Sequence, residues 1–419
     1  MKILFLPAYY FPETAASSYL GDNIREALCK EKISIELYAP TPTRGISAEE
    51  RNKYKKLKRE SLFDGYLNIH RFSLYAEGKT PVLRALRYTL CWIKQFNRGL
   101  FAKDIDCIYL ASTPPIQGVL GGMLSKLKRV PFVYNLQDIF PDSLVGTGMT
   151  RKGSLLWKIG RRIENFTYRN ADKIIVISQD FKRNIMAKGV PEEKIEVVYN
   201  WVDENAITPV KDEENELFEE FGISRDKFRV VYAGNLGNAQ NIEIIVNAAR
   251  RLKENIQIEF IIFGKGGLED EIKDTKTQEQ LDNLKILPLQ PYERVAKVYG
   301  LGHVCIVACK PGLGGAAMPS KTWSIMSSGR AVLANFDEGE LKEIVEGGPS
   351  TGSGTAKPCD VFTKAGDLEG FVAAIEELSK HPERCAEMGR NGRQFILENL
   401  TREVGTRKYV EVIKGVVNK

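Results

Sequence analysis

The sequence has 419 residues, of which 43% are hydrophobic and 27% are charged, as is typical of a globular protein. One hydrophobic core rarely supports a chain of this length, so we expect two domains of similar size. No run approaches the roughly 18 apolar residues that a membrane-spanning helix needs. The seven cysteines are scattered and lack paired spacing, which is typical of reduced core thiols in a cytosolic protein and not of a disulfide framework or a zinc site.

The net charge of +6 is distributed unevenly along the chain. Residues 1–200 contain 32 Lys and Arg against 20 Asp and Glu, whereas residues 201–419 contain 28 against 34. A basic first half favours contact with a polyanion, and an anionic membrane surface is the candidate we retain. Solvated lysines without such a role are the alternative. We expect no nucleic acid as a partner, because the basic residues are not interleaved with aromatics in a recognisable motif.

The first half predicts a parallel sheet covered by helices. Its opening segment, MKILFLPAYYF, has one basic residue and a short apolar run. A signal peptide is one interpretation, but the segment lacks a small-residue cleavage site and leads into a polar amphipathic segment, so we expect a first buried strand. Apolar runs then alternate with amphipathic helices. The six expected strands are residues 2–6, 34–39, 67–72, 107–111, 132–136 and 173–177.

The most basic segment spans residues 51–101 and contains a predicted helix at residues 81–101. At about 100° per residue, Arg84, Arg87, Lys94 and Arg98 share one helix face. The opposite face carries apolar residues, namely Val82, Leu86, Leu90, Ile93, Phe96 and Leu100. Such a helix can lie in a membrane interface beside anionic head groups, or its apolar stripe can pack on the domain core. Both interpretations remain open from the sequence.

The second half repeats the α/β pattern. Its expected strands are residues 228–233, 258–263, 284–287, 304–308 and 331–335. The break between the two sheets falls near residues 200–212, where a strand-like run gives way to a charged stretch. We therefore expect a first domain at residues 1–203 and a second at 204–398. A C-terminal segment, 399–419, carries a helix at about residues 402–417 that packs back on one of the two domains.

In a doubly wound sheet, ligands bind at the carboxyl ends of the strands, so the loops there are the candidate sites. After the first strand comes Glu13, followed by Ala15, Ala16 and Ser17 at the start of a helix whose first amides point toward a ligand. A tight strand-to-helix turn also favours small residues, so this signal does not identify a ligand.

Two glycine-containing loops follow strands of the second half. Gly237 permits close backbone approach, and Asn235 and Gln240 can hydrogen-bond to a phosphate or ribose. The spacing lacks the three-glycine fingerprint of a dinucleotide-binding dehydrogenase. Gly264 follows the next strand, where a flat base can lie against bare backbone. For each loop, a tight turn without a ligand is the alternative.

The segment MPSKTW is the sharpest local signal. Pro319 favours a helix start, Ser320 offers a hydroxyl group, and Lys321 adds a positive charge. This combination suits a diphosphate that departs as a leaving group. A capped helix with a surface lysine is the alternative. Because the chain contains no Gly-x-x-x-x-Gly-Lys-Ser/Thr loop, the sequence disfavours an ATPase or a kinase.

The sequence predicts no metal site. The three histidines, His70, His303 and His381, have no partner at ligand spacing. Asp104 and Asp106 form an Asp-x-Asp pattern, which metal-dependent glycosyltransferases use to hold a diphosphate. Here the pattern precedes a predicted strand and does not follow one, so we interpret it as a solvated turn.

Taken in order, these loops resemble glycosyltransferase family 4. The resemblance covers nearly the whole chain and is strongest at residues 171–203, 233–243 and 318–334. The combination of LQDIFPDS, GNLGNAQ and PSK is similar to the WbuB-type branch, which serves O-antigen and capsular polysaccharide assembly. The implied fold class is α/β with GT-B architecture, in which two Rossmann-like doubly wound domains face each other across a cleft.

The resemblance also implies an activity. It predicts a retaining, metal-independent hexosyltransferase that needs no cofactor. A nucleotide-sugar donor, with UDP as the expected nucleotide, binds the second domain, and a lipid diphosphate-linked saccharide acceptor binds the first. The departing phosphate then helps to deprotonate the acceptor. Together with the charge asymmetry, the resemblance predicts a cytoplasmic enzyme that binds peripherally to the inner face of the cell membrane through residues 51–101.

The implied donor contacts are Asn235, Gly237, Gln240, Gly264, Pro319, Ser320 and Lys321. Two departures from the family pattern affect this set, and a third affects the acceptor contacts. Ala316 and Ser324 stand where many members carry glutamates, which leaves Glu340 as a substitute. Asn235 and Gln240 stand where an Arg and a Lys are common, so Lys321 must neutralise more of the negative charge of the diphosphate.

The implied acceptor contacts are Glu13, Ala15, Ala16, Ser17, Gln137 and Asp138. The third departure is Gln137, which stands where a histidine near the donor sugar is frequent. Asp138 beside it can accept a hydrogen bond from a sugar hydroxyl or cap a helix. It joins Lys321 as a candidate catalytic residue. The alternative functions are a nucleotide-sugar epimerase of similar fold, which the shortage of histidine disfavours, and a non-catalytic subunit that binds the nucleotide-sugar.

Overall fold

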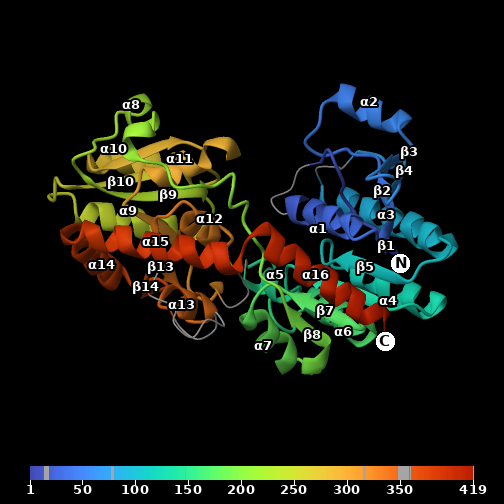
Figure 1. Cartoon of the computed structure of the whole chain (residues 1–419). Coiled ribbons are helices and arrows are strands. Elements are labelled where there is room, and N and C mark those ends of the chain that lie inside the picture. The colour runs from blue at the N-terminus through green and yellow to red at the C-terminus, as the bar shows by residue number, and fades with distance from the viewer. Residues whose placement is uncertain are drawn as a thin grey trace. The chain divides into compact units, whose positions relative to one another are not determined.

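The computed structural model describes residues 1–13, 18–76, 80–146, 148–314, 318–347, 358 and 360–418. The chain forms two α/β units, one comprising Met1–Tyr199 with Glu403–Lys419 and the other Asn200–Arg402 (Figure 1). Each unit has its own sheet flanked by helices. The expected fold class of two Rossmann-like parallel sheets is confirmed.

The first unit contains an eight-stranded sheet of order β3-β4-β2-β1-β5-β6-β7-β8. All neighbours are parallel except β3 and β4, which are antiparallel. The order reverses between β1 and β5, so the loops after these strands diverge and leave room for a ligand. The strands are β1 (Lys2–Phe5), β2 (Ser34–Pro40), β3 (Arg59–Leu62), β4 (Leu67–Phe72), β5 (Cys107–Ala111), β6 (Phe132–Leu136), β7 (Lys173–Val176) and β8 (Ile195–Val197).

Helices of the first unit pack closely on this sheet. In particular, α4 lies against both α3 and α6. Gly118 of α4 allows this approach, because a Cβ atom there would lie 2.3 Å from the side chain of Thr167 in α6. The helices are α1 (Ser18–Lys30), α2 (Ala48–Lys56), α3 (Pro81–Phe101), α4 (Gln117–Lys128), α5 (Asp142–Gly146), α6 (Leu155–Asn170), α7 (Gln179–Ala187) and α16 (Arg402–Val417).

The second unit contains a six-stranded, wholly parallel sheet of order β11-β10-β9-β12-β13-β14. Its order reverses between β9 and β12. The strands are β9 (Phe228–Asn235), β10 (Ile258–Lys265), β11 (Leu284–Pro288), β12 (Val304–Ala308), β13 (Ala331–Phe336) and β14 (Asp360–Lys364). The helices are α8 (Leu217–Glu220), α9 (Ile242–Arg251), α10 (Glu269–Glu279), α11 (Val295–Gly300), α12 (Lys321–Ser327), α13 (Glu340–Val345), α14 (Leu368–Lys380) and α15 (Pro382–Asn399).

The eleven strands expected from the sequence are all present, with ends that differ by at most two residues. Continuous apolar runs explain this agreement, since β6 and β12 are buried along their whole length. The sequence missed β3 and β14, and β8 overlaps the strand-like run that preceded the expected break near residue 200. Three of the four residues of β3 are exposed, so this edge strand has no apolar pattern to detect.

Helix α3 begins and ends where the sequence predicted, but one residue of its predicted basic face departs from the others. Arg84, Lys94 and Arg98 are exposed, whereas Arg87 is completely buried. Gln95, two turns later, is also completely buried. Its side-chain amide is satisfied there because it donates to the carbonyl oxygens of Pro7 and Tyr38. The face buried against the sheet therefore contains two polar side chains beside the apolar Cys91.

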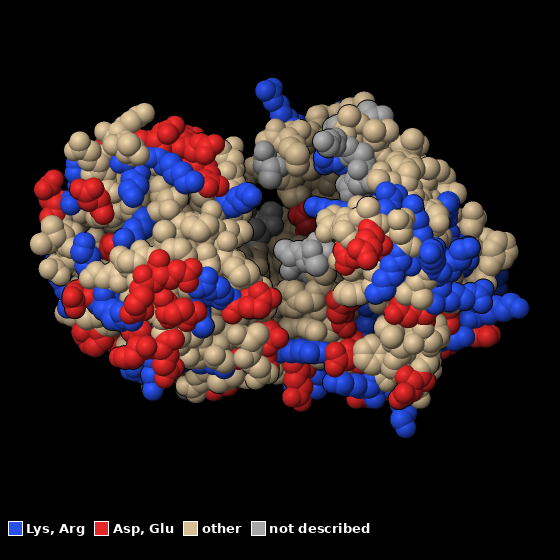
Figure 2. All heavy atoms as spheres, turned by 90° about the horizontal axis from the view of Figure 1, so that it is seen from above, with Lys and Arg blue, Asp and Glu red and all other residues tan. Residues whose placement is uncertain are grey.

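Part of the apolar side of α3 is exposed as a consequence. Leu83, Leu86 and Ile93 keep 45%, 50% and 44% of their surface accessible. In the space-filling view, Lys and Arg side chains gather over the unit that carries α2 and α3, while both signs are interspersed over the other unit (Figure 2). Within the described residues, no helix is long and apolar enough to cross a membrane.

Candidate functional site

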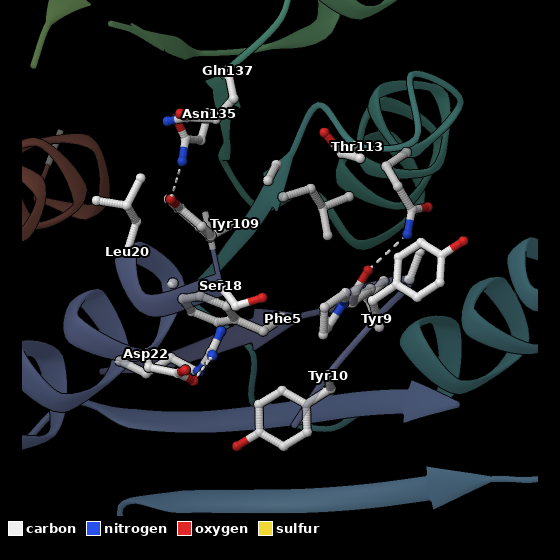
Figure 3. A pocket seen from close by; sticks show the side chains of 18 of the residues that line it. Phe5, Tyr9, Tyr10, Ser18, Leu20, Asp22, Tyr109, Thr113, Asn135 and Gln137 are labelled. Carbon is white, nitrogen blue, oxygen red and sulfur yellow. Dashed lines mark hydrogen bonds and ion pairs between the residues drawn. The ribbon is translucent and has the colours of Figure 1, made fainter. Parts of the chain in front are cut away.

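A pocket of about 220 Å³ lies at the carboxyl end of the first sheet, where the strand order reverses (Figure 3). The loop that follows β1 supplies one wall, with Tyr9, Tyr10 and Glu13. The end of β5 and the loop after it supply Tyr109 and Thr113. Strand β6 contributes Asn135, and helix α1 contributes Ser18, Leu20, Asp22 and Arg25. We call this the switch-point pocket.

A hydrogen-bond network lies along one side of the switch-point pocket. The Asn135 amide donates to the Tyr109 hydroxyl oxygen at 2.8 Å (Figure 3). The side-chain oxygen of Asn135 accepts from the side-chain amide of Gln137 at 2.8 Å and from the Tyr409 hydroxyl at 3.1 Å. Burial raises the pKa of both tyrosines, so their hydroxyls stay protonated at neutral pH. Such neutral amides and hydroxyls match the donors and acceptors of a sugar.

Glu13 is a buried carboxylate in the wall of the switch-point pocket. Its Oε1 accepts from the backbone N–H groups of Thr43 at 2.6 Å and Arg44 at 2.8 Å. Its Oε2 is buried and has no hydrogen-bond partner among the described residues. The same loop is held from the other side by Arg87, whose Nη2 donates to the Thr43 hydroxyl. Glu13 therefore fixes the loop after β2 and retains one oxygen that can accept a hydrogen bond.

The other acceptor-side predictions have different outcomes. Ala15, Ala16 and Ser17 lie outside the described residues. Gln137 lines the switch-point pocket, but Asp138, the next residue, does not. Asp138 is exposed and its Oδ2 accepts from the hydroxyl of Ser143 in α5 at 3.0 Å. The structure thus brings Glu13 and Gln137 to one pocket and leaves Asp138 outside it.

In the second unit, Lys321 lies at the carboxyl end of β9. Its Nζ is 3.1 Å from the Tyr232 hydroxyl oxygen and 4.2 Å from the centre of that ring. A Cβ atom on Gly234, which has φ = 146°, would lie 3.0 Å from this Nζ. Among the described residues, no carboxylate lies within ion-pair distance of Lys321. Burial among uncharged groups lowers the pKa of Lys321 to about 8.

The loop after β9 brings three predicted donor residues together. The side-chain amide of Asn235 donates to the side-chain oxygen of Gln240 at 3.3 Å. Both side chains lie against Gly237, where a Cβ atom would meet them at 2.7 and 3.0 Å. Gly264 at the end of β10 faces Leu236, because a Cβ atom there would lie 2.6 Å from its Cδ2. The close packing of these two loops therefore already requires glycine at 264, and its contact with a base stays a prediction.

The remaining donor-side predictions surround Lys321. Pro319 is half-buried, Ser320 is exposed, and α12 begins at Lys321 and has only seven residues. So short a helix has a small dipole, and the positive charge of this site is mainly that of the lysine. Glu340 begins α13 and is completely buried, with 0% of its surface exposed. Its proposed role as a ribose contact stays a prediction.

The sequence-based interpretation of Asp104 and Asp106 agrees with their position. Asp104 has φ = 56°, and Asp106 accepts from the backbone N–H of Lys2 at 2.7 Å. Both precede β5 and lie at the amino edge of the sheet, away from the switch-point pocket. No group of three or more His, Cys, Asp or Glu residues suited to a metal ion occurs in the described part of the chain. The six cysteines that the structure describes are all buried and free.

Sequence reasoning missed four functional candidates. Tyr109, Asn135 and Tyr232 each lie inside a predicted strand. A polar residue within a buried apolar run gives no separate signal of a functional site. Tyr409 lies in the last helix, 274 residues from Asn135. A polar residue near the carboxyl end of a buried strand was the signal available for Asn135.

Two family descriptions together account for most of the chain. Residues 22–206 match Glycosyltransferase Family 4, and residues 213–395 match Glycosyl transferases group 1. The chain belongs to glycosyltransferase family 4. The family 4 match begins at residue 22 and covers most of the unit with the switch-point pocket, and the group 1 match covers most of the unit with Lys321.

Named relatives of this family 4 chain include a protein of Escherichia coli K12 that carries the name colanic acid biosynthesis glycosyl transferase WcaI. It is 24% identical over 99% of this chain and 100% of its own length. Another, named glycosyltransferase WbjE, of Pseudomonas aeruginosa, is 23% identical over 83% of this chain and 82% of its own.

Solved structures support the fold. HepE of Anabaena in complex with UDP aligns with a TM-score of 0.69 and 18% identity over 99% of this chain and all of its own. Sucrose-phosphate synthase of Thermosynechococcus elongatus aligns with a TM-score of 0.73 and 13% identity over 99% of this chain and 98% of its own. At these identities, the likeness concerns the fold alone.

Proposed function

We propose that this family 4 member is a retaining hexosyltransferase that moves a sugar from a UDP-sugar to a lipid diphosphate-linked saccharide during surface polysaccharide assembly. The observation that carries the proposal is Lys321, a cation without a carboxylate partner among the described residues, beside the bare backbone of Gly234. An uncompensated cation where a phosphate can approach bare backbone is what a departing diphosphate needs.

The comparisons favour this choice of donor and product. HepE, which shares the fold, was solved with UDP and also with UDP-glucose. WcaI carries a name from colanic acid synthesis, which is the making of a polysaccharide. The O-antigen or capsule remains our proposal for the product of this chain.

On the donor side, Lys321 and Ser320 meet the diphosphate, while Asn235, Gly237 and Gln240 approach it from the loop after β9. Gly264 and Glu340 complete the donor set. Because Lys321 supplies the charge, the proposed reaction needs no metal. As the bond from the anomeric carbon to the phosphate oxygen breaks, the negative charge grows on the diphosphate beside Lys321, and the diphosphate takes the proton of the attacking acceptor hydroxyl.

On the acceptor side, the sugar occupies the switch-point pocket. Gln137 and the free Oε2 of Glu13 bind its hydroxyls, and Tyr109 with Asn135 orients Gln137. The segment with Ala15, Ala16 and Ser17 belongs to this proposal on sequence grounds alone. Asp138 keeps its candidate role only if substrate binding turns its side chain from Ser143 toward the acceptor.

We further propose that the enzyme is cytoplasmic and binds the inner face of the membrane through residues 51–101. The exposed Leu83, Leu86 and Ile93 of α3 and the basic side chains around them support this. Flotation with phosphatidylcholine vesicles, with and without phosphatidylglycerol, tests it. Binding that does not depend on the anionic lipid would contradict the proposed docking.

The activity itself is tested by incubating the full chain with UDP-glucose, UDP-galactose or UDP-N-acetylglucosamine, each with and without a polyprenyl diphosphate-linked sugar. We expect UDP release that depends on the acceptor and persists in EDTA. Conversion of one UDP-sugar into another without acceptor would instead identify an epimerase. Binding of the UDP-sugar without either reaction would identify a non-catalytic subunit.

A further inference from the structure

A second pocket of about 400 Å³ lies on the same carboxyl edge of the first sheet, next to β2 and β4. Helices α2 and α3 close it on two sides. It is lined by Thr41, Tyr54, Lys55, Lys58, Arg71, Phe72, Ser73, Lys94, Asn97 and Arg98. Five of these ten residues are Lys or Arg and none is Asp or Glu. We call it the basic pocket.

The cations of the basic pocket are largely uncompensated. Among the described residues, no carboxylate lies within ion-pair distance of Lys55, Lys58, Lys94 or Arg98. Lys94 donates instead to the carbonyl oxygen of Ser73 at 2.7 Å. Four like charges around one hollow repel each other, and a polyanionic ligand would relieve this repulsion.

Arg71 makes the basic pocket more than a patch of surface lysines. Only 2% of its side chain is exposed, and its Nη1 donates to Glu60 at 2.8 Å. The guanidinium group is held over the rings of Tyr54 and Tyr10 at 4.9 and 5.6 Å. Its Nε is buried without a hydrogen-bond partner among the described residues. A fixed, planar donor with an unused N–H suits a phosphate oxygen.

The basic pocket adjoins the switch-point pocket. The ring of Tyr10, which lines the switch-point pocket, lies under the Arg71 guanidinium group. Phe11 of the same wall contacts Tyr54 of the basic pocket edge-on, with ring centres 6.2 Å apart. The carboxyl edge of the sheet therefore carries the switch-point pocket, with its amide and hydroxyl groups, directly beside a pocket lined by cations.

We infer that the basic pocket binds the phosphate or diphosphate group of a membrane lipid, and that this lipid is the acceptor whose sugar occupies the switch-point pocket. The inference rests on the proposed function for the sugar, while the phosphate site rests on the basic pocket alone. Its exposed neighbours on α3, Leu86 and Ile93, offer an apolar surface to the lipid chain.

The test is lysine footprinting of the full chain, read by mass spectrometry as the acetylation rates of Lys55, Lys58 and Lys94. The three probes are vesicles of phosphatidylcholine alone, with phosphatidylglycerol, and with a polyprenyl diphosphate at equal surface charge. We expect the polyprenyl diphosphate to slow acetylation of these lysines at least threefold more than phosphatidylglycerol does. Lys103 and Lys126, which lie outside the pocket, should change equally with both.

Two variants make the test specific. Lys55→Ala/Lys58→Ala/Arg98→Ala should weaken binding to the polyprenyl diphosphate vesicles about tenfold relative to the charge-matched Lys103→Ala/Lys126→Ala/Lys152→Ala. Arg71→Lys keeps the charge but loses the planar fork, so it should also weaken this binding. Equal protection by phosphatidylglycerol would assign the pocket to ordinary head groups and overturn the acceptor assignment. No protection by either lipid would overturn the site itself.

The outcome is separable from that of the proposed function, because footprinting requires no turnover. A chain that protects these lysines but transfers no sugar retains the phosphate site and loses the proposed reaction. A triple variant that transfers sugar with an unchanged acceptor KM retains the reaction and overturns the phosphate site.

Discussion

The ammonium group of Lys321 lies 3.1 Å from the hydroxyl oxygen of Tyr232 and 4.2 Å from the centre of its ring. The same hydroxyl donates to the carbonyl oxygen of Asn235 at 2.8 Å, so the tyrosine links the lysine to the loop after β9. An aromatic ring and a hydroxyl group hold a protonated lysine without neutralising its charge. Lys321 is thus positioned and still available to an anion.

Replacing Lys321 by Ala should weaken UDP binding by ten- to a hundredfold, because a charge-assisted contact to the diphosphate is lost. Isothermal titration calorimetry with UDP measures this directly. Lys253→Ala is the matched control, since this lysine follows α9 near the opposite edge of the sheet. Its ammonium group donates a hydrogen bond to the backbone carbonyl oxygen of Glu279. Equal affinities for the two variants would remove the central support of the proposed donor site.

Nucleotide affinity should also depend on pH near the lowered pKa of Lys321, which is about 8. Below that pH the free protein carries the cation and binds the diphosphate without proton uptake. Above it the lysine must gain a proton on binding, so UDP affinity should fall by up to tenfold per pH unit. Titrations from pH 6.5 to 9.5 measure the slope, and Lys321→Arg, whose side chain stays charged, should flatten it. An equal slope in this variant would assign the effect to another group.

The strands and the Lys321 loop could be predicted from sequence because each depends on residues close together in the chain. A continuous apolar run predicts a buried strand wherever it later lies in the sheet. The segment from Pro319 to Lys321 likewise carries its helix-start signal and its charge within three residues. Such local signals suffice for the fold class and for one side of the candidate site.

The rest depended on tertiary packing. Periodicity showed that α3 has two faces, but which face is buried is decided by Pro7 and Tyr38, whose carbonyl oxygens accept from Gln95. Likewise, nothing near Arg71 in the sequence reveals that this residue lines a pocket between α2 and α3. Contacts between distant segments leave no local signal, and they build the switch-point pocket and the basic pocket.

Tyr409→Phe should raise the acceptor KM about fivefold and leave UDP affinity unchanged. The change removes the hydrogen bond to Asn135, which is worth about 1 kcal/mol, and loosens the amide that orients Gln137. Initial rates at varied acceptor concentration measure the effect. The control is Tyr292→Phe, since Tyr292 is 55% exposed and lies in the other unit. An unchanged acceptor KM in Tyr409→Phe would show that the network does not position the acceptor.

Leu86→Ser/Ile93→Ser should reduce binding to anionic vesicles about tenfold, because two half-exposed apolar side chains of α3 would no longer enter the interface. Leu127→Ser/Ile256→Ser removes apolar groups elsewhere that are more exposed, at 58% and 73%, and should leave binding intact. Vesicle co-sedimentation measures both. Equal losses would mean that α3 has no special part in docking.

Gly264→Ala should destabilise the second unit by about 1–3 kcal/mol, the usual range for an overpacked site. The new Cβ atom would lie 2.6 Å from Leu236 Cδ2 and 2.7 Å from the Gly234 carbonyl oxygen, and the backbone atom cannot move without shifting β9. Gly267→Ala in the same loop is the control, because nothing lies within 4 Å of its added methyl group. Calorimetry should show a lower Tm for Gly264→Ala alone. If both variants melt like the parent chain, the two loops are not packed as tightly as these distances require, and the glycine at 264 would have to be explained by a ligand instead.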